Sequence, residues 1–489
     1  MSQAARTLIV DVPGPVLTPA QGAFLRAHGF GGVCLFARNI VTPEQTARLV
    51  RDLRDALGEG AWIATDQEGG AVLRRLDVPP PPAPRALGVI GREAVAGEAG
   101  RLTARGLIEL GVNWNFAPVL DVNVNPGNPV IGERAFGDDP AAAARLGTAW
   151  ALGLEAGGVM SAVKHFPGHG DTHQDSHLTL PVVDKPLEAL EATEWPPFRA
   201  AVAAGVGSVM TAHIVYPALD PGRPATLSPA LLTGLLRGQW GYDGVVVTDA
   251  TDMRAIADRH PHGTAAPLAL AAGADAVLSC GHGDLETHAE HARALDAALR
   301  EGSLAESRVA EARARLERAA RHFPGTPRPY AANRRAADEA SVAAWAREAL
   351  TFLGEVPRLS PDGPVLLYAP RGAPVGGPYG DAPSGEALAG ALRVRFPRLH
   401  VALHGDEARN FDGHLLRSFP GAPVLLATLD RWSPPVWQSA LARALRDRTA
   451  VHLALWTAHV FEGAPLPTLA THGFREVNLR AAADFLAGG

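Results

Sequence analysis

The stretch VMSAVKHFPGHGDTHQDSH, residues 159–177, joins an apolar run to a long polar segment rich in glycine and histidine. Its first seven residues are typical of a buried parallel strand, which reads as an almost continuous apolar run. Pro167, Gly168 and Gly170 exclude a continuous helix beyond it, although four histidines recur there at four-residue spacing. We therefore expect a strand that ends at His165 and leads into a long polar loop.

Similar apolar runs alternate with helical segments through the first two-thirds of the chain. The eight predicted strands are TLIVDV (7–12), GVCLFA (32–37), AWIATD (61–66), VNWNFAPVLD (112–121), VMSAVKH (159–165), SVMTAH (208–213), VVVTD (245–249) and AVLS (276–279). Helical segments such as 42–57 and 228–240 open on Thr or Ser, the residue types that favour an N-cap. Eight strand–helix units in about 320 residues predict a TIM (β/α)8 barrel.

A second domain is expected because 489 residues exceed what one hydrophobic core usually supports. The Pro/Gly-rich stretch FPGTPRPYAANRR (323–335) is typical of a linker. Beyond it, four apolar runs alternate with helical segments: PVLLYAP (364–370), LHVALHG (399–405), PVLLATL (423–429) and VHLALW (451–456). We predict a TIM-barrel domain over 1–325, a linker over 326–340 and a smaller α/β domain with a parallel sheet over 341–489.

Composition argues against several classes of protein. The formal net charge of −6 is small for this length, so we expect neither a nucleic-acid nor a membrane partner. The N-terminal sequence lacks the pattern of a signal peptide, and no apolar run is long enough to span a bilayer. Cys34 and Cys280 lie in apolar surroundings, which indicates free buried thiols. These features predict a cytoplasmic protein.

The carboxyl ends of the predicted strands carry polar residues. In a TIM barrel the active site lies at these ends. The residues found there are Asp66, Asp121, Lys164, His165, His213 and Asp249. We expect most of them to converge on one site, and we interpret Asp121 as structural.

Three interpretations of the loop over 164–177 are open: a metal site, an acid/base loop, or a solvated turn. TIM-barrel metallohydrolases use clustered His and Asp, but the HxH pair that usually supplies their first ligands is absent from the early strands. We predict no metal and no cofactor. The triplet Asp175-Ser176-His177 suits acid/base chemistry, because a carboxylate can orient an imidazole whose ordinary pKa is about 6.5.

Lysine is almost absent from this chain. Only Lys164 and Lys185 occur among 45 basic residues. Keeping Lys164 at a strand end indicates a position where a compact ammonium fits and a planar guanidinium does not.

These residues also carry a resemblance to a known family. KHFPGHG followed by DSH resembles the signature of glycoside hydrolase family 3, in its β-N-acetylglucosaminidase branch. Further segments agree in order: LFARNI (35–40), TDQEGG (65–70), FAPVLDVN (116–123), IGERAFG (131–137), MTAHI (210–214), PATLSP (224–229) and VVTDATDM (246–253). The resemblance spans the predicted barrel, whereas the second domain agrees only in general form.

The resemblance implies roles for residues of this chain. Asp249 corresponds to the nucleophile of a retaining β-glycosidase, and His177 with its partner Asp175 corresponds to the acid/base. Positions that bind the sugar in this branch correspond to Asp66, Arg134, Lys164 and His165.

Three other polar residues of these motifs receive lesser roles. Asp252 is a rival nucleophile, which we interpret as structural because it lies in a loop or a first helical turn. His169 is expected to bond to the backbone of its loop, and His173 to be solvated. The chain departs from the family pattern at Ala135, often Ser in the family, and in the polar stretch 250–252.

The resemblance implies an exo-acting β-N-acetylglucosaminidase whose substrates are GlcNAc-containing cell-wall fragments, met in the cytoplasm during peptidoglycan recycling. Three alternatives stay open: a β-N-acetylglucosaminide phosphorylase, a family 3 β-glucosidase or β-xylosidase, and a catalytically idle sugar-binding protein. The oligomeric state is not predicted.

Overall fold

The first domain is a nearly closed barrel of parallel strands. The structure is a computed structural model that describes residues 3–74, 78–174, 176, 179–373, 383–405, 411, 413–429, 436–456 and 465–489. The barrel strands are β1 (Leu8–Val10), β2 (Gly32–Leu35), β3 (Trp62–Thr65), β4 (Trp114–Asn115), β5 (Met160–Phe166), β6 (Ser208–Thr211), β9 (Val245–Val247) and β10 (Val277–Leu278). They pair in the order β10-β1-β2-β3-β4-β5-β6-β9, and a parallel bridge between Val247 and Ala276 joins the two ends. The predicted TIM-type barrel and its eight strands are confirmed.

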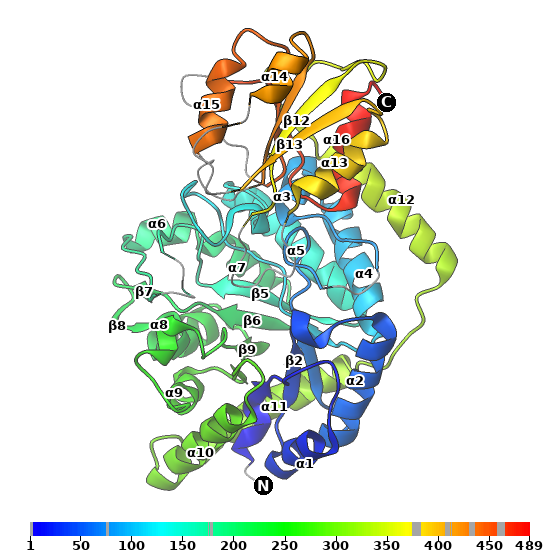
Figure 1. The fold of residues 1–489 in the computed structure, drawn as a ribbon. Coiled ribbons are helices and arrows are strands. Elements are labelled where there is room, and N and C mark those ends of the chain that lie inside the picture. Colours follow the sequence, from blue (N-terminus) through cyan, green and yellow to red (C-terminus); the bar gives the residue numbers. More distant parts are fainter. Residues whose placement is uncertain are drawn as a thin grey trace.

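Helices cover the outside of the barrel (Figure 1). They are α1 (Pro19–His28), α2 (Pro43–Leu57), α3 (Pro84–Ile90), α4 (Glu93–Glu109), α5 (Pro140–Ala156), α6 (Leu187–Ala192), α7 (Trp195–Ala203), η5 (Ala230–Gln239), α8 (Arg254–Ala257), α9 (Ala265–Ala272), α10 (Leu285–Glu301) and α11 (Glu306–His322). The hydroxyl of Thr42 caps α2 by accepting from the Gln45 amide at 3.2 Å. Gly29 ends α1 in the left-handed conformation (φ 69°), which glycine adopts without strain.

Short helical turns and a hairpin complete the barrel domain. The turns are η1 (Ala4–Thr7), η2 (Ala37–Asn39), η3 (Gly132–Arg134) and η4 (Ala225–Leu227), and the hairpin strands are β7 (Val215–Tyr216) and β8 (Asp220–Pro224). The strand predicted over 112–121 is much shorter than expected. Only Trp114 and Asn115 form β4, and the next segment contacts β5 again through an isolated bridge at Val119.

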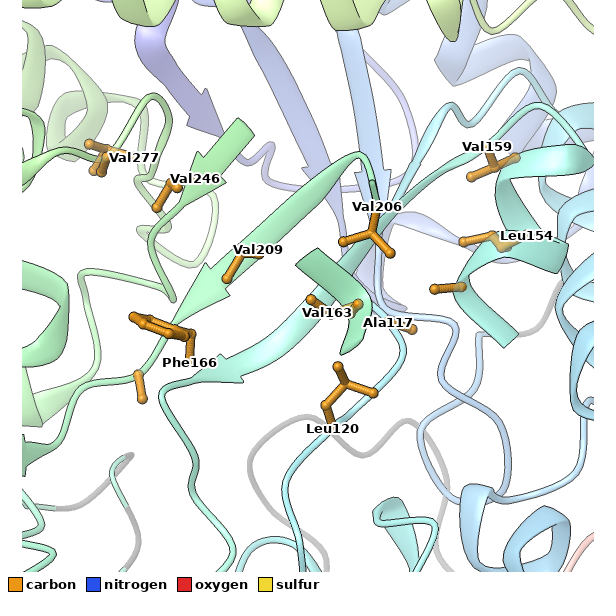
Figure 2. Close-up of a cluster of buried hydrophobic side chains, with 14 of the residues drawn as sticks. Ala117, Leu120, Leu154, Val159, Val163, Phe166, Val206, Val209, Val246 and Val277 are labelled. Atoms are coloured by element: carbon orange, nitrogen blue, oxygen red, sulfur yellow. The ribbon is translucent and has the colours of Figure 1, made fainter. Parts of the chain in front are cut away.

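Successive side chains along the strands pack on opposite faces. Val163, Val209 and Val246, from the neighbouring strands β5, β6 and β9, belong to the core between the strands and the helices (Figure 2). The adjacent residues Ala162 and Met210 belong instead to a separate core that fills the barrel interior. Because the side-chain period of a strand is two, strands with both faces buried read as continuous apolar runs.

The second domain is a six-stranded sheet with helices on its faces. Its elements are α12 (Ala332–Glu348), β11 (Thr351–Leu353), β12 (Val365–Pro370), α13 (Gly385–Arg393), β13 (Leu399–His404), α14 (His414–Ser418), β14 (Val424–Thr428), α15 (Val436–Ala444), β15 (Ala450–Ala454), β16 (Thr468–Ala470) and α16 (Glu476–Leu486). The strand order is β11-β16-β15-β14-β12-β13. The four predicted strands are parallel, as is β16, whereas β11 pairs antiparallel with β16. Helix α12 begins at Ala332, within the segment predicted as a linker.

The second domain packs against the barrel, above it in the view of Figure 1, and α12 lies at the right-hand edge of the molecule. Ala71, from the loop after β3, is fully buried in the hydrophobic core of the second domain. Ala83 and Ala86 of the barrel pack against Ala349. The residues that follow β3 therefore connect the barrel to the second domain.

Two compositional expectations can be compared with the structure. Cys34 and Cys280 are free and buried, as expected. Within the described ranges, no helix combines the length and the apolar character that crossing a bilayer requires.

Candidate active site

A pocket of about 500 Å³ opens at the carboxyl ends of the barrel strands. Five of the seven residues predicted for the site line it: Asp66, Arg134, Lys164, His165 and Asp249. They follow or end strands β3, β5 and β9, except for Arg134, which lies in the short turn η3. The other two, Asp175 and His177, lie outside the described residues.

Lys164 is held between two carboxylates. Its ammonium donates to Oδ1 of Asp66 at 2.9 Å and lies 2.6 Å from Oε1 of Glu68. Arg134 forms a two-pronged pair with the same Glu68, in which Nε and Nη2 each lie 2.8 Å from a carboxylate oxygen. The side chain of Glu68 is fully buried, whereas that of Asp66 is 13% exposed. Asp66 is thus the carboxylate of this cluster that faces the pocket.

The charges of the cluster stabilise one another. Burial alone would raise the pKa of Glu68, but Arg134 and Lys164 hold it well below its usual range. Burial alone would lower the pKa of Lys164, but Asp66 and Glu68 raise it above its ordinary value. The ammonium therefore stays charged at neutral pH and can donate to a bound hydroxyl.

Glu68 and Arg74 were not assigned from the sequence, although both lie in or next to the motif TDQEGG. Arg74 lines the pocket and donates from Nη2 to Oδ2 of Asp66 at 3.1 Å. A hydrogen bond within the loop holds its backbone, because the backbone N–H of Arg74 donates to Oε1 of Gln67 at 2.7 Å. The Gln67 amide donates in turn to Asn115 of β4 at 2.8 Å. The sequence could have indicated Glu68, because the motif TDQEGG places a second acidic residue close behind Asp66 at the end of a strand.

His165 is oriented by Asp121. Its Nδ1 donates to Oδ2 of Asp121 at 2.7 Å, and its backbone amide donates to Oδ1 at 3.1 Å. Although burial raises the pKa of Asp121, His165 lowers it below its ordinary value, so the carboxylate is ionised and only accepts. Fixing Nδ1 as the donor leaves Nε2 as the imidazole nitrogen that can contact a ligand.

His169 holds the loop that leaves β5, but not in the expected way. Its ring bonds to hydroxyls, with Nδ1 2.8 Å from Thr172 Oγ1 and Nε2 3.0 Å from Ser176 Oγ, rather than to the backbone. Burial lowers the pKa of His169 to about 4, so this imidazole is neutral at physiological pH. Ser176 lies between Asp175 and His177, so His169 anchors the one described residue of the acid/base triplet.

Two further described residues of the loop, Asp171 and His173, lie nearer the solvent. His173 is exposed, with Nδ1 3.1 Å from the Asn125 amide nitrogen. Asp171 pairs with Lys185 at 2.7 Å, and the same ammonium lies 2.7 Å from Glu194. Lys185, which the sequence left without a role, ties the loop to α7.

Asp249 enters the pocket from the end of β9. Its Oδ1 accepts from the Ala250 amide at 2.8 Å. His213, after β6, donates from Nε2 to the Ala250 carbonyl at 2.9 Å and so supports this turn. Burial raises the pKa of Asp252 to about 6, and its Oδ2 lies 3.5 Å from His282. A carboxyl that holds its proton up to this pH is a weaker nucleophile than an ionised one.

Two further pocket residues, Asp11 and Arg38, also follow barrel strands but were not predicted from the sequence. Asp11 follows β1 and pairs with Arg38, which follows β2; both line the pocket. The Asp11 carboxylate also lies 2.9 Å from Nε2 of the buried His288. Although burial raises the pKa of Asp11, His288 and Arg38 lower it below the ordinary value.

Among the described histidines of the loop, His165 and His169 do not face a common point. The rings of His165 and His169 lie 5.6 Å apart, but their bonded nitrogens face Asp121 and two hydroxyls. Within the described part of the chain, no group of three or more His, Cys, Asp or Glu side chains has an arrangement that could hold a metal ion.

The barrel with polar residues at its strand ends is the architecture of a TIM-barrel enzyme. Residues 15–319 match the model of the glycosyl hydrolase family 3 N-terminal domain. The chain therefore belongs to glycoside hydrolase family 3.

Three similar proteins place the chain more finely within this family. It is similar to a β-hexosaminidase of Chromobacterium violaceum (40% identity over 286 residues, 56% of this chain and 78% of that one). It is also similar to β-hexosaminidase A of Pseudoalteromonas piscicida (40% over 267 residues, 50% of this chain), of which the match spans only 44%. The structure of a family 3 β-N-acetylglucosaminidase from Paenibacillus sp. str. FPU-7 is similar over both domains (TM-score 0.89, 31% identity, 99% of this chain and 96% of that one).

Proposed function

We propose that this protein is a retaining exo-β-N-acetylglucosaminidase that removes terminal β-linked GlcNAc. The observation that carries the proposal is one pocket that combines the Asp66–Lys164 pair with Asp249, at the carboxyl ends of β3, β5 and β9. Similarity to β-hexosaminidases and to a two-domain β-N-acetylglucosaminidase supports the sugar.

In this proposal the charged cluster binds the sugar. Asp66 accepts from one hydroxyl of a neighbouring pair and Lys164 donates to the other, and such charge-assisted bonds contribute about 1.5–3 kcal/mol each. His165 adds Nε2 as a further contact, and Arg134 lines the pocket while it fixes Glu68. The substrate is thereby positioned with C1 toward Asp249.

The reaction has two steps, each with a nucleophile and a proton transfer. In the first, a carboxylate oxygen of Asp249 forms a bond to C1 while the C1–O bond breaks and His177 gives its proton to the leaving oxygen. In the second, a water oxygen attacks C1, the bond to Asp249 breaks, and His177 accepts the proton of the water. Asp175 orients His177 in both steps.

The natural substrate and its location belong to the same proposal. We propose muropeptide fragments of peptidoglycan, processed in the cytoplasm, and this assignment rests on the resemblance alone. The pocket would then accept a GlcNAc unit whose leaving group is a second, substituted sugar.

The test compares two isosteric variants three residues apart, Asp249→Asn and Asp252→Asn. Release of nitrophenol is measured from the aryl β-N-acetylglucosaminide and the aryl β-glucoside, with EDTA in a parallel set. We expect cleavage of the N-acetyl substrate only, unchanged by EDTA. Asp249→Asn should lower kcat by at least about a thousandfold, and Asp252→Asn by less than about tenfold.

Each alternative predicts a different result. Preferred cleavage of the β-glucoside would indicate a β-glucosidase, and loss of activity with EDTA would restore the metal interpretation. A product that becomes a sugar 1-phosphate when phosphate is added would indicate a phosphorylase. Binding of GlcNAc without any turnover would indicate an idle binding protein.

A further inference from the structure

The loop after β3 connects the pocket to the second domain. Within nine residues, 66–74, it carries three side chains of the charged cluster, Asp66, Glu68 and Arg74. The tip of the loop is formed by Gly70 and Ala71. It faces the second domain and not the pocket, because Ala71 is fully buried in the core of the second domain. A displacement of the tip would therefore be transmitted over a few residues to Asp66, the carboxylate proposed to bind the sugar.

Arg475 of the second domain contacts this tip. Its Nε donates to the Gly70 carbonyl at 3.1 Å, and its Nη2 donates to the Ala71 carbonyl at 3.4 Å. Arg475 is the N-cap residue of α16, and its guanidinium lies 5.1 Å from the centre of the Phe474 ring. Backbone carbonyls at buried positions need a donor, and a single guanidinium here serves two of them.

The barrel holds the same tip from its other side. The Ala71 amide donates to Oε1 of Glu133 at 3.0 Å, and the Gly70 amide donates to the Pro81 carbonyl at 3.2 Å. Gly70 has a φ of 59°, and a Cβ there would lie 2.5 Å from that of Ala83, so the tip accepts only glycine at this position. The amides of the tip are thus satisfied by the barrel, whereas Arg475 serves its carbonyls.

We propose that Arg475 is a positioning residue for sugar binding, which acts through the loop 66–74. Arg475 is not among the described residues that line the pocket, so it acts on Asp66 and Arg74 through the backbone. The inference rests on the proposed function and gives the second domain a part in it: a domain from which no described residue lines the pocket supports the site of the barrel.

The experiment uses the full-length protein with Arg475→Ala, Arg475→Lys and a control, Arg480→Ala. Arg480 lies five residues further along the chain, within α16, and pairs with Glu476 at the surface. KM and kcat are measured with the aryl β-N-acetylglucosaminide, and binding of GlcNAc by calorimetry. We expect Arg475→Ala to raise KM about tenfold with kcat changed less than about twofold, because the loop is displaced but the reacting groups remain.

Two comparisons separate positioning from mere stability. Arg475→Lys should recover part of the loss in KM, since one ammonium can still serve one carbonyl. The double variant Asp66→Asn/Arg475→Ala should bind GlcNAc no more weakly than Asp66→Asn alone, because both changes remove the same contact. Arg480→Ala should match the wild type.

The inference is overturned if Arg475→Ala keeps the KM and the GlcNAc affinity of the wild type, even with a lower unfolding temperature. It is also overturned if the double variant shows the sum of the two single losses. If Arg475→Ala does not fold, the inference is overturned when Arg475→Lys has the KM of the wild type. If the wild type cleaves neither aryl substrate, the proposed function is wrong. The role of Arg475 is then tested by calorimetry alone, from the GlcNAc affinity of the wild type and of Arg475→Ala.

Discussion

The ammonium nitrogen of Lys164 lies 2.6 Å from Oε1 of Glu68, and the two side chains are 3% and 0% exposed. Asp66, Arg74 and Arg134 complete the cluster around this buried pair. Buried charges are stable only while their partners remain, because an unpaired charge in a region of low dielectric is strongly disfavoured. The pair therefore supports the fold of the loop after β3 as well as the charge state of the pocket.

Replacing the buried carboxylate should destabilise the protein. Glu68→Gln leaves Lys164 and Arg134 with one fewer negative partner, and we expect the free energy of unfolding to fall by about 3 kcal/mol. Urea denaturation followed by tryptophan fluorescence measures the change. The control is Glu93→Gln, which removes a half-exposed pair with Arg145 and should cost less than about 1 kcal/mol. Equal effects of the two variants would show that burial of the pair is unimportant.

Lys164 should not tolerate arginine. Its ammonium fits between Asp66 and Glu68, and Arg134 already contacts both oxygens of Glu68, so a second guanidinium has no matching acceptor. We expect Lys164→Arg to raise KM for the N-acetyl substrate at least about tenfold. Lys185→Arg is the matched control, and it should leave KM within about twofold because its pairs lie nearer the surface. An unchanged KM in Lys164→Arg would contradict the inference that this position requires a compact ammonium.

Stability should decrease in mild acid because of His169. Burial lowers its pKa from 6.5 to about 4 in the folded protein. Between these values the unfolded chain binds a proton that the folded chain does not, so the free energy of unfolding falls as the pH drops from 6.5 toward 4. We expect His169→Gln to reduce that slope by up to about 1.4 kcal/mol per pH unit. Urea titrations at several pH values measure it, and identical slopes would show that folding does not lower the pKa of His169. His472, whose pKa burial also lowers to about 4, is retained in both proteins, so its contribution cancels.

Azide should distinguish the nucleophile from the acid/base. In Asp249→Gly the anion can occupy the vacated position and attack C1 once, giving the α-glycosyl azide. In His177→Ala the covalent intermediate still forms, and attack by azide on its opposite face gives the β-glycosyl azide. The anomeric coupling constant of the product in NMR spectra separates the two. The same anomer from both variants would contradict the assigned roles.

Residues at strand ends were predictable because a parallel barrel places all such ends on one face. Asp66, Lys164, His165 and Asp249 were found in this way, and the structure places them in one pocket. Asp11 and Arg38 obey the same rule and could have been found by it. The roles of Asp175 and His177 stay predictions from the motif.

Partners contributed by separate elements were not predictable. Glu68 stands in a motif that was recognised, yet its function depends on Arg134, 66 positions away, and on Lys164 of another strand. The ring partners of His169 also differed from expectation, because the loop folds back to bring Thr172 and Ser176 onto one imidazole. The three-residue strands β11 and β16 lacked the longer apolar runs that marked the four predicted strands of the second domain.

The amino-acid sequence by itself determined the alternation of strands and helices, and with it the face on which Asp66, Lys164, His165 and Asp249 gather. Apolar periodicity and the residues that cap helices are local signals that mark where each strand ends. Because the strands of the barrel are parallel, their carboxyl ends lie on one face. Only the tertiary structure decided which charges pair and what holds the loop after β3, because those contacts join residues as distant as Gly70 and Arg475, 405 positions apart. Contacts of that kind exist only once the barrel has closed and the second sheet has docked on it, and no periodicity in the chain encodes them.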